Sequence, residues 1–386
     1  MRLLLEDIDL PAAAGDQRIV VAMSGGVDSS VAAALFREAG FEVVGITLRL
    51  YDHGKVIGRK GACCAGEDLE DARRVAERLG IAHYVLDYEA RFAEAVIADF
   101  ARSYGKGETP VPCVRCNERI KFRDLLGVAR DLGAAALVTG HYARRRRGRA
   151  GVELHKAKDP SRDQSYFLFA TKREELSYLR FPLGGLSKEE TRTEARRFLL
   201  PVAEKRDSQD LCFVPQGSYA RLVAELEPEA ARPGEIVDRE GRILGRHDGI
   251  AHFTVGQRKG LGLASAEPYY VLRLEPATGR VVVGPKAALG QSRIELAEVN
   301  WLGDPLAEGG AASLSVKLRS TQTPVAARYF SRGGGAGELL LAAPAAAAPG
   351  QAAVFYKGER VLGGGWIRRR LDPEHPLPYM PGRAAG

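Results

Sequence analysis

The stretch "VVAMSGGVDSS", Val20 to Ser30, begins as an apolar run, breaks into glycine, serine and aspartate, and then resumes its apolar pattern as "VAAALFREAG". This order predicts a strand, a tight loop and a helix. Such a loop presents backbone N–H groups at a helix N-terminus, where they and the helix dipole attract phosphate. Glycine lets the backbone approach a ligand, serine adds hydroxyl donors, and Asp28 could cap the helix or hold Mg²⁺. The stretch has neither the spacing of a Walker A loop nor GxGxxG, so it predicts a different phosphate-binding loop.

Short β-rich runs alternate with helical patterns over residues 18–140. We expect strands over 18–23, 41–50, 82–88 and 135–140. Helices are expected up to Ala39, over 68–79 and over 121–132, ended by Gly40, Gly80 and Gly133. Strands separated by helices of this length predict a doubly wound α/β fold, a parallel sheet with helices on both faces. Ligands bind such sheets at the carboxyl ends of the strands.

The pattern changes beyond Pro160. Residues 184–201 predict a helix with a capping box at Ser187 and Glu190. After about residue 216 helical patterns become rare, and 234–245, 268–284 and 311–320 are typical of strands and turns. We therefore expect a catalytic domain over 1–215, a small central β-rich domain over 216–290 and a C-terminal β-barrel-like domain over 291–386.

The chain has 386 residues, a formal net charge of +7 and a pI near 9.1, which favours a polyanionic partner such as RNA. The run "RRRRGR", Arg144 to Arg149, could bind such a partner or form a surface loop. The sequence lacks a run of about 20 apolar residues, so we expect a cytoplasmic protein. Five cysteines in a protein of that compartment favour metal or thiol chemistry over structural disulfides.

Several motifs carry a resemblance to a known family. The loop "SGGVDSS" resembles the pyrophosphate loop of the ATP pyrophosphatase superfamily, whose members cleave ATP between the α and β phosphates. The segments "TPVPCVRCNERIKF" (109–122), "TGHYAR" (139–144), "DPSRDQSYFL" (159–168) and "DSQDLCFVP" (207–215) together resemble the tRNA-specific 2-thiouridylase family over nearly the whole chain. The resemblance implies an N-terminal sheet of the adenine nucleotide alpha hydrolase type and a cytoplasmic tRNA-uridine 2-sulfurtransferase.

The reaction implied by this resemblance converts the wobble uridine, position 34 of the anticodon loop, to 2-thiouridine with release of AMP and diphosphate. ATP turns the poorly reactive C2 carbonyl oxygen into a leaving group, and a protein thiolate delivers sulfur. The resemblance makes Cys212 the persulfide carrier and Cys116 its catalytic partner. Cys116 is expected just before a helix, where the helix dipole would favour the thiolate.

Cys113 stands where many family members carry aspartate, in a segment thought to contact the target base. Cys113 and Cys116 form a CxxC pair that, with Cys212, could ligate an iron-sulfur cluster. A zinc site would have to recruit Cys63 or Cys64, which we otherwise expect to be loop residues without a catalytic role. No metal ligands are assigned on the main interpretation.

The resemblance also assigns binding residues. Those expected at ATP are Ala22, Met23, Ser24, Gly25, Gly26, Val27, Asp28, Ser29, Leu48 and Gly140, and those expected at tRNA are Arg162, Asp163, Gln164, Arg319 and Ser320. Ser320 departs from the family, which more often has an aromatic residue there. We expect a plain loop role for His141, because the sequence shows no partner for it.

The implied partners are tRNAs for Lys, Glu and Gln, and a cysteine desulfurase or sulfur-relay protein as sulfur donor. Two enzyme classes remain as alternatives, an iron-sulfur-dependent tRNA thiolase and an amide-forming synthetase with the same loop. The synthetase would need an ammonia source, yet the sequence shows no glutaminase domain. A non-catalytic RNA-binding module would explain the charge but not the loop and the cysteines.

Overall fold

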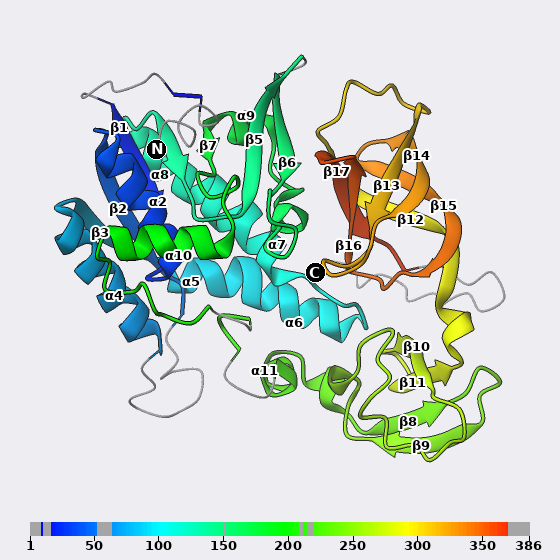
Figure 1. Ribbon diagram of the computed structural model, residues 1–386. Coiled ribbons are helices and arrows are strands. Elements are labelled where there is room, and N and C mark those ends of the chain that lie inside the picture. The colour runs from blue at the N-terminus through cyan, green and yellow to red at the C-terminus, as the bar shows by residue number, and fades with distance from the viewer. Residues whose placement is uncertain are drawn as a thin grey trace, which may run out of the picture.

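The computed structural model describes residues 9–10, 17–51, 64–149, 151–207, 211–214 and 219–369. Figure 1 shows three regions: a parallel sheet with helices, a small sheet at the lower right and a larger antiparallel sheet at the upper right. The fold class expected from the sequence is confirmed in all three regions. None of the helices in the described ranges is both long and apolar enough to cross a membrane.

The N-terminal sheet has the strand order β3-β2-β1-β4-β7, and all its pairings are parallel. Its strands are β1 (Arg18–Ala22), β2 (Glu42–Arg49), β3 (Ala82–Asp87), β4 (Ala136–Val138) and β7 (Leu179–Arg180). The α-helices of this region are α2 (Val27–Glu38), α4 (Cys64–Leu79), α5 (Glu89–Phe92), α6 (Ala98–Gly105), α7 (Pro112–Cys116), α8 (Leu125–Asp131), α9 (Arg173–Tyr178) and α10 (Lys188–Arg197). Two π-helices, Ala93–Ile97 and Asn117–Asp124, and a 3-10 helix, Ser165–Leu168, complete it.

Side chains alternate across β1 and build a core on each face of the sheet. Ile19 and Val21 pack in a cluster that contains the buried residues of α2 and α4. Val20 packs in the opposite cluster, which contains residues of α7 and α8. Both cores bury their β1 side chains completely. The strands therefore sit between helical layers, and their carboxyl ends remain free to form a site.

The central region is a mixed sheet with the order β10-β11-β8-β9. Its strands are β8 (Gly234–Val237), β9 (Ile243–His247), β10 (Tyr270–Glu275) and β11 (Arg280–Gly284), with α11 (Tyr219–Leu226) and the 3-10 helices Pro228–Ala231 and Ile250–His252. The β8–β11 pairing is parallel and the other two pairings are antiparallel. The expected domain boundary between 215 and 216 lies outside the described residues.

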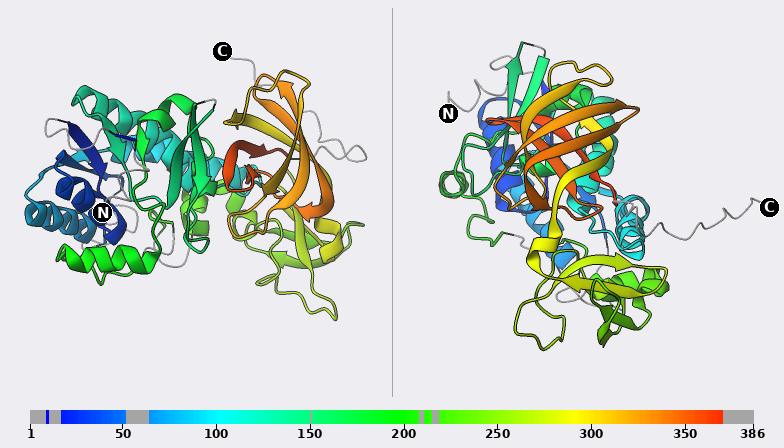
Figure 2. Two further views of the ribbon diagram at one scale, coloured as in Figure 1. Left: turned by 45° about the horizontal axis from the view of Figure 1, so that its top comes forward. Right: turned by 90° about the vertical axis from the view of Figure 1, so that its right-hand side faces the viewer.

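The C-terminal region closes into a barrel because β12 pairs with both β15 and β17 (Figure 2). Its strands are β12 (Gly290–Trp301), β13 (Ala311–Lys317), β14 (Val325–Gly333), β15 (Ala336–Ala346), β16 (Ala352–Lys357) and β17 (Arg360–Ile367), preceded by the 3-10 helix Lys286–Leu289. The domain boundary expected between 290 and 291 falls at the start of β12.

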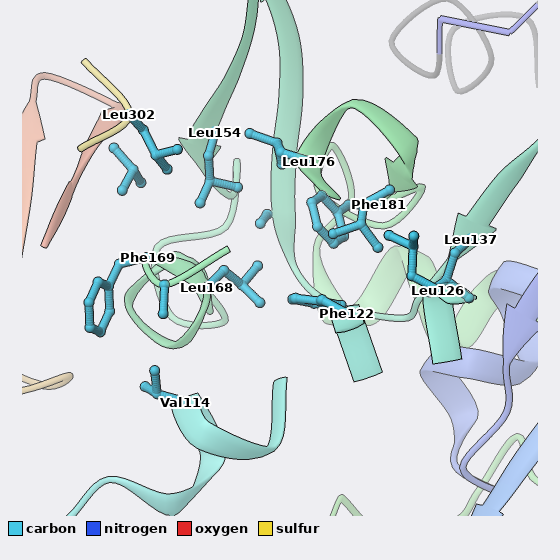
Figure 3. Close-up of a cluster of buried hydrophobic side chains, with 14 of the residues drawn as sticks. Val114, Phe122, Leu126, Leu137, Leu154, Leu168, Phe169, Leu176, Phe181 and Leu302 are labelled. Carbon is cyan, nitrogen blue, oxygen red and sulfur yellow. The ribbon is translucent and has the colours of Figure 1, made fainter. Parts of the chain in front are cut away.

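A hairpin of the N-terminal region, β5 (Ala143–Gly148) and β6 (Gly151–Lys156), extends the barrel sheet. Strand β6 pairs with β17, so that His155 lies opposite Arg360 and Leu154 opposite Val361. One core spans this junction. Figure 3 shows Leu154, Phe169 and Leu302 among its side chains, and Leu302 follows β12 directly. The sheet and the barrel therefore share buried surface.

The arginine run is a strand and not a surface loop, which corrects one of the two interpretations of this run. Arg144 to Arg147 lie in β5. Arg145 is almost fully buried and donates to the carbonyl oxygen of Leu176 at 3.2 Å and to Asp9 at 3.0 Å. The side chains of Arg144 and Arg145 are 11% and 5% exposed, whereas that of Arg147 is 76% exposed, so the positive charge of the run is only partly available to a polyanion.

Candidate active site

A cavity of about 240 Å³ lies at the carboxyl ends of β1, β2 and β4. It is lined by Ala22, Met23, Ser24, Asp28, Ser29, Ile46, Leu48, Leu50, Lys121, Leu125, Thr139, Gly140, His141 and Gln164. Seven of the residues expected at ATP are among them, together with Gln164 from the set expected at tRNA. The structure does not place Gly25, Gly26 or Val27 in the lining. The cavity thus lies where parallel sheets bind ligands.

The loop after β1 leaves the first amides of α2 without a side-chain cap. Gly26 is the N-cap residue and has no side chain to accept from them. The hydroxyl of Ser29 donates to the carbonyl oxygen of Gly26 at 3.2 Å and accepts from the amide of Ser24 at 3.1 Å. Ser30 also donates to the Gly26 carbonyl, at 2.8 Å, and is fully buried. Its hydroxyl therefore does not face a bound phosphate, contrary to the expectation that the serines of this loop add donors. Uncapped amides at a helix N-terminus are a binding site for an anion.

Gly25 and Val27 shape this loop from outside the cavity. Gly25 has φ +70°, and a Cβ there would lie 2.1 Å from the carbonyl oxygen of Asp68. The side chain of Lys205 fixes the same contact, donating to the Gly25 carbonyl at 3.1 Å and to Asp68 and Asp71 at 2.6 and 2.5 Å. Val27 is buried in the core. Glycine at position 25 is therefore required by packing against α4.

Asp28 forms an ion pair with Lys188, a residue that was not predicted from the sequence. Lys188 Nζ lies 2.7 Å from Asp28 Oδ1 and 2.7 Å from Asp207 Oδ1. The hydroxyl of Tyr142 donates to the same Asp28 oxygen at 2.9 Å. One sequence signal was available: Lys188 follows the N-cap Ser187, and the helix dipole disfavours a cation in the first turn. A lysine in the first turn therefore indicates that its charge serves an interaction outside the helix, here with Asp28 and Asp207.

His141 lies in a loop, as expected, and also lines the cavity. Burial, together with a smaller effect of Lys121, lowers its pKa to about 3, so the ring is neutral at physiological pH. Its Nδ1 lies 2.8 Å from Thr139 Oγ1, and its ring contacts those of Phe122 and Phe181 edge-on. A neutral ring held this way can exchange a hydrogen bond with a ligand but does not supply positive charge.

Cys116 does not stand just before a helix, which corrects the expectation. It is the last residue of α7 and continues directly into the π-helix Asn117–Asp124. The helix dipole therefore does not act on its thiol as it would at an N-terminus. Burial raises the pKa of Cys116, and the neighbouring Cys113 raises it further. In this conformation the thiol is protonated.

Cys212 belongs to the same group of thiols. Desolvation, together with the charges of Cys116 and Cys113, raises its pKa to about 12. Phe213, the next residue, packs in the cluster that holds Cys116. Lys121 lowers the pKa of all three cysteines and also lines the cavity. The structure thus brings the two proposed catalytic thiols together beside the cavity.

Two further expectations concern Cys63 and Cys64 and a metal site formed by the cysteines. Cys63 lies outside the described residues, and Cys64 is the first residue of α4 and not a loop residue. Within the described ranges, no group of three or more His, Cys, Asp or Glu side chains is arranged to hold a metal ion. The three thiols are neighbours without forming such a group.

The expected tRNA residues occupy three different environments. Arg162 is exposed and pairs with Asp207 at 2.9 Å. Asp163 accepts from the amides of Ala157 and Ser165, both at 3.1 Å, and so shapes its own loop. Gln164 accepts from the amide of Tyr142 at 2.9 Å and faces the cavity.

Arg319 and Ser320 follow β13 on the barrel. Arg319 is exposed, and it lies close enough to Tyr166 to lower the pKa of that phenol, against the larger effect of burial. Ser320 accepts from Lys317 Nζ through its carbonyl oxygen at 3.1 Å. Arg319 therefore lies near the segment that follows Gln164, although it belongs to another domain.

Comparison with known proteins gives matches along the whole described chain. A model described as the tRNA methyl transferase HUP domain matches residues 17–216, a tRNA methyl transferase PRC-barrel domain matches 223–285, and an aminomethyltransferase beta-barrel domain matches 291–367. The chain is 59% identical over 375 residues to tRNA-specific 2-thiouridylase MnmA of Parvibaculum lavamentivorans, covering 95% of this chain and 94% of the relative. It is 58% identical over 382 residues to the Rhodospirillum centenum protein of the same name, covering 96% and 97%.

Replacing Gly140 by alanine should impair ATP binding. A Cβ at this position would lie 2.7 Å from the amide nitrogen of Ser29 and 2.8 Å from the carbonyl carbon of Asp28, and neither backbone can move without opening the loop. We expect the Kd for ATP, measured by calorimetry, to rise by at least about tenfold. Gly127→Ala is the matched control. Gly127 lies in α8, where an added Cβ would meet no neighbouring atom within 4 Å, so this variant should bind ATP normally. Wild-type affinity in Gly140→Ala would contradict the assigned cavity.

The raised thiol pKa values predict a steep pH dependence of alkylation. The thiolate fraction below a pKa rises tenfold per pH unit, so alkylation of Cys212 by iodoacetamide should rise about tenfold per unit between about pH 7 and 9. The alkylation rate is measured by peptide mass spectrometry on protein that is free of nucleotide and tRNA. Lys121→Met should slow the reaction, because Lys121 lowers the pKa of Cys212, whereas Lys121→Arg should not. A plateau below pH 8 would contradict the prediction.

Proposed function

The chain belongs to the tRNA-specific 2-thiouridylase family, and from that membership we propose that its cavity and neighbouring thiols form 2-thiouridine at the wobble position of the anticodon loop. The enzyme acts on tRNA, and its HUP domain uses ATP. The single observation that supports the site assignment is Lys121, which lines the cavity and lowers the pKa of Cys113, Cys116 and Cys212. Nucleotide and sulfur chemistry therefore have neighbouring places in the fold.

The phosphate loop would bind ATP through the uncapped amides of α2, which favour an anion. Leu48 and Gly140 would border the nucleotide, because both line the cavity. The uridine O2 attacks the α-phosphorus, a bond to diphosphate breaks, and the oxygen becomes part of an AMP leaving group. Asp28 is the carboxylate that would hold Mg²⁺ there, since hard cations prefer carboxylate and phosphate oxygens. Lys188 and Tyr142 hold that carboxylate in place.

Sulfur transfer would use both cysteines. The terminal sulfur of a Cys212 persulfide attacks C2 of the activated uridine and displaces AMP. The Cys116 thiolate then attacks Sγ of Cys212, the sulfur–sulfur bond breaks, and 2-thiouridine leaves while a Cys116–Cys212 disulfide forms. A cellular thiol reductant must open this disulfide before the next cycle. Both residues are free thiols in the structure, as the start of the cycle requires.

Family membership and this chemistry together suggest the partners. Cys212 is exposed, so a cysteine desulfurase or a sulfur-relay protein could load it with sulfur. The tRNA substrates would be those for Lys, Glu and Gln. Arg162 and Arg319 are exposed cations on two domains and would contact the RNA backbone. Gln164 faces the cavity and would contact the unstacked base or its ribose.

The iron-sulfur alternative has one observation in its favour, the proximity of three thiols. Anaerobically purified protein should contain neither iron nor acid-labile sulfide if Cys212 acts as a persulfide carrier. About one cluster per chain, lost together with activity in Cys113→Ser, would favour the cluster-dependent thiolase instead.

Cysteine variants test the proposed roles in a reaction with tRNA, ATP and a persulfide donor. Cys212→Ser should abolish 2-thiouridine, measured by mass spectrometry of nucleosides, while it leaves tRNA affinity and the ATP-dependent adenylation of tRNA, measured as diphosphate release, largely unchanged. Cys116→Ser should also lose product, and it should accumulate tRNA linked to Cys212 through a disulfide, because the thiolate that breaks this bond is missing. Cys64→Ser is the control and should be active. Product formation by Cys212→Ser, or loss of 2-thiouridine from a position other than 34 in a deletion strain, would overturn the proposal.

A further inference from the structure

Arg115, the neighbour of Cys116 in α7, is held by the barrel. Its Nη1 donates to Glu298 Oε2 at 2.7 Å and its Nη2 to Glu298 Oε1 at 3.2 Å. Its guanidinium lies over the ring of Trp366, 4.1 Å from Cζ to the ring centroid. The Arg115 side chain is only 12% exposed. Two parallel bonds and a stacked ring fix both the position and the orientation of the guanidinium.

Glu298 adopts a backbone conformation that ordinarily belongs to glycine. It has φ +47° in β12, where the pairing with β17 shifts register between Ala297 and Asn300. A left-handed backbone costs free energy in any residue with a Cβ, and such strain persists where other contacts or function require it. Among the described residues, the side-chain hydrogen bonds of Glu298 are to Arg115, outside the barrel, and the bulge directs the carboxylate there.

The same bulge also holds the segment that follows Gln164. Asn300 Nδ2 donates to the carbonyl oxygens of Phe169 and Thr171 at 2.6 and 2.8 Å. From the other side, the side chain of Asn117, the residue after Cys116, donates to the carbonyl oxygen of Phe167 at 3.1 Å. Figure 3 shows Val114 of α7 near Phe169 in this junction. The barrel, the cysteine helix and the tRNA segment therefore meet at one place.

Other carboxylates near Arg115 allow its ion pair with Glu298 to be removed without leaving Arg115 unpaired. Arg115 also pairs with Glu118 at 3.0 Å, and its Nε lies 3.8 Å from Asp99. Arg119 pairs with Asp99 at 3.4 Å and helps to lower the pKa of Glu298. Neutralising Glu298 thus leaves Arg115 with two carboxylates of its own domain, and no buried cation loses all its partners.

We propose that Arg115 and Glu298 form a positioning pair that sets the Cys116 thiol against Sγ of Cys212 according to where the barrel holds the tRNA. The inference rests on the proposed roles of Cys116 and Cys212. The pair acts on sulfur transfer and not on adenylation, because neither residue lines the cavity or contacts the phosphate loop. The barrel contributes to chemistry through this contact, beyond its contribution to tRNA affinity.

Glu298→Gln keeps the size and the strained backbone of the residue but removes its charge. In single turnovers of persulfide-loaded enzyme with saturating tRNA and ATP, we expect 2-thiouridine to form about tenfold more slowly, with AMP release unchanged. The Kd for tRNA, measured separately, should also be unchanged. Glu295→Gln is the matched control. Glu295 is an exposed residue of the same strand for which the described residues show no ion pair, and its variant should react at the wild-type rate.

Glu298→Gly separates positioning from stability. Glycine relieves the strain, so the melting temperature should stay the same or rise, while the thiolation rate falls as in Glu298→Gln. The double variant Arg115→Gln with Glu298→Gln should be no slower than the slower single variant, because both substitutions break the same contact. Wild-type rates in both Glu298 variants, or equal losses of AMP release and thiolation, would overturn the positioning pair. The wild-type reaction in the same assay tests the proposed function independently, since failure to form 2-thiouridine there would refute that function instead.

Discussion

The site depends on the unsatisfied amides at the start of α2. Gly26 supplies no cap, Ser30 turns back to the Gly26 carbonyl, and the Ser29 hydroxyl bonds within the loop. A helix end of this kind is stable when water or an anion meets its N–H groups. The neighbouring elements keep the end open. Lys205 fixes the loop to α4 and Lys188 fixes Asp28, so the amides stay aligned for a ligand without the ligand having to order them.

Much of the parallel sheet could be predicted because its signals are local. The alternation of apolar runs and helical patterns, with left-handed glycines at 40, 80 and 133, corresponds to β1 through β4 and the helices between them. The loop and its cavity follow from the same pattern. The ion pairs could not be predicted, because Lys188 and Asp28 are 160 residues apart and no periodicity relates them. The hairpin β5–β6 was missed because four consecutive arginines conceal the alternation typical of a strand.

The pKa of Cys116 could not be predicted from its local sequence. A helix N-terminus at Cys116 would have lowered its pKa, but α7 begins at Pro112 and continues through Cys116 into a π-helix. Burial and the neighbouring sulfur then raise the pKa of Cys116, and only Lys121 opposes them. A protonated thiol is a weak nucleophile and a poor target for oxidants. In this conformation the Cys116 thiol therefore reacts slowly with electrophiles and oxidants.

The pairing of β6 with β17 makes the chain less modular than its three matched segments suggest. A barrel produced from residue 291 onward would have β17 without its β6 neighbour, and Leu302 and Trp366 would lose the buried surface that they share with Phe169. An N-terminal fragment would likewise expose the backbone edge of β6, and free strand edges promote aggregation. During synthesis the hairpin is made long before its partner strand, so β6 can pair with β17 only after the strands of the barrel have been made.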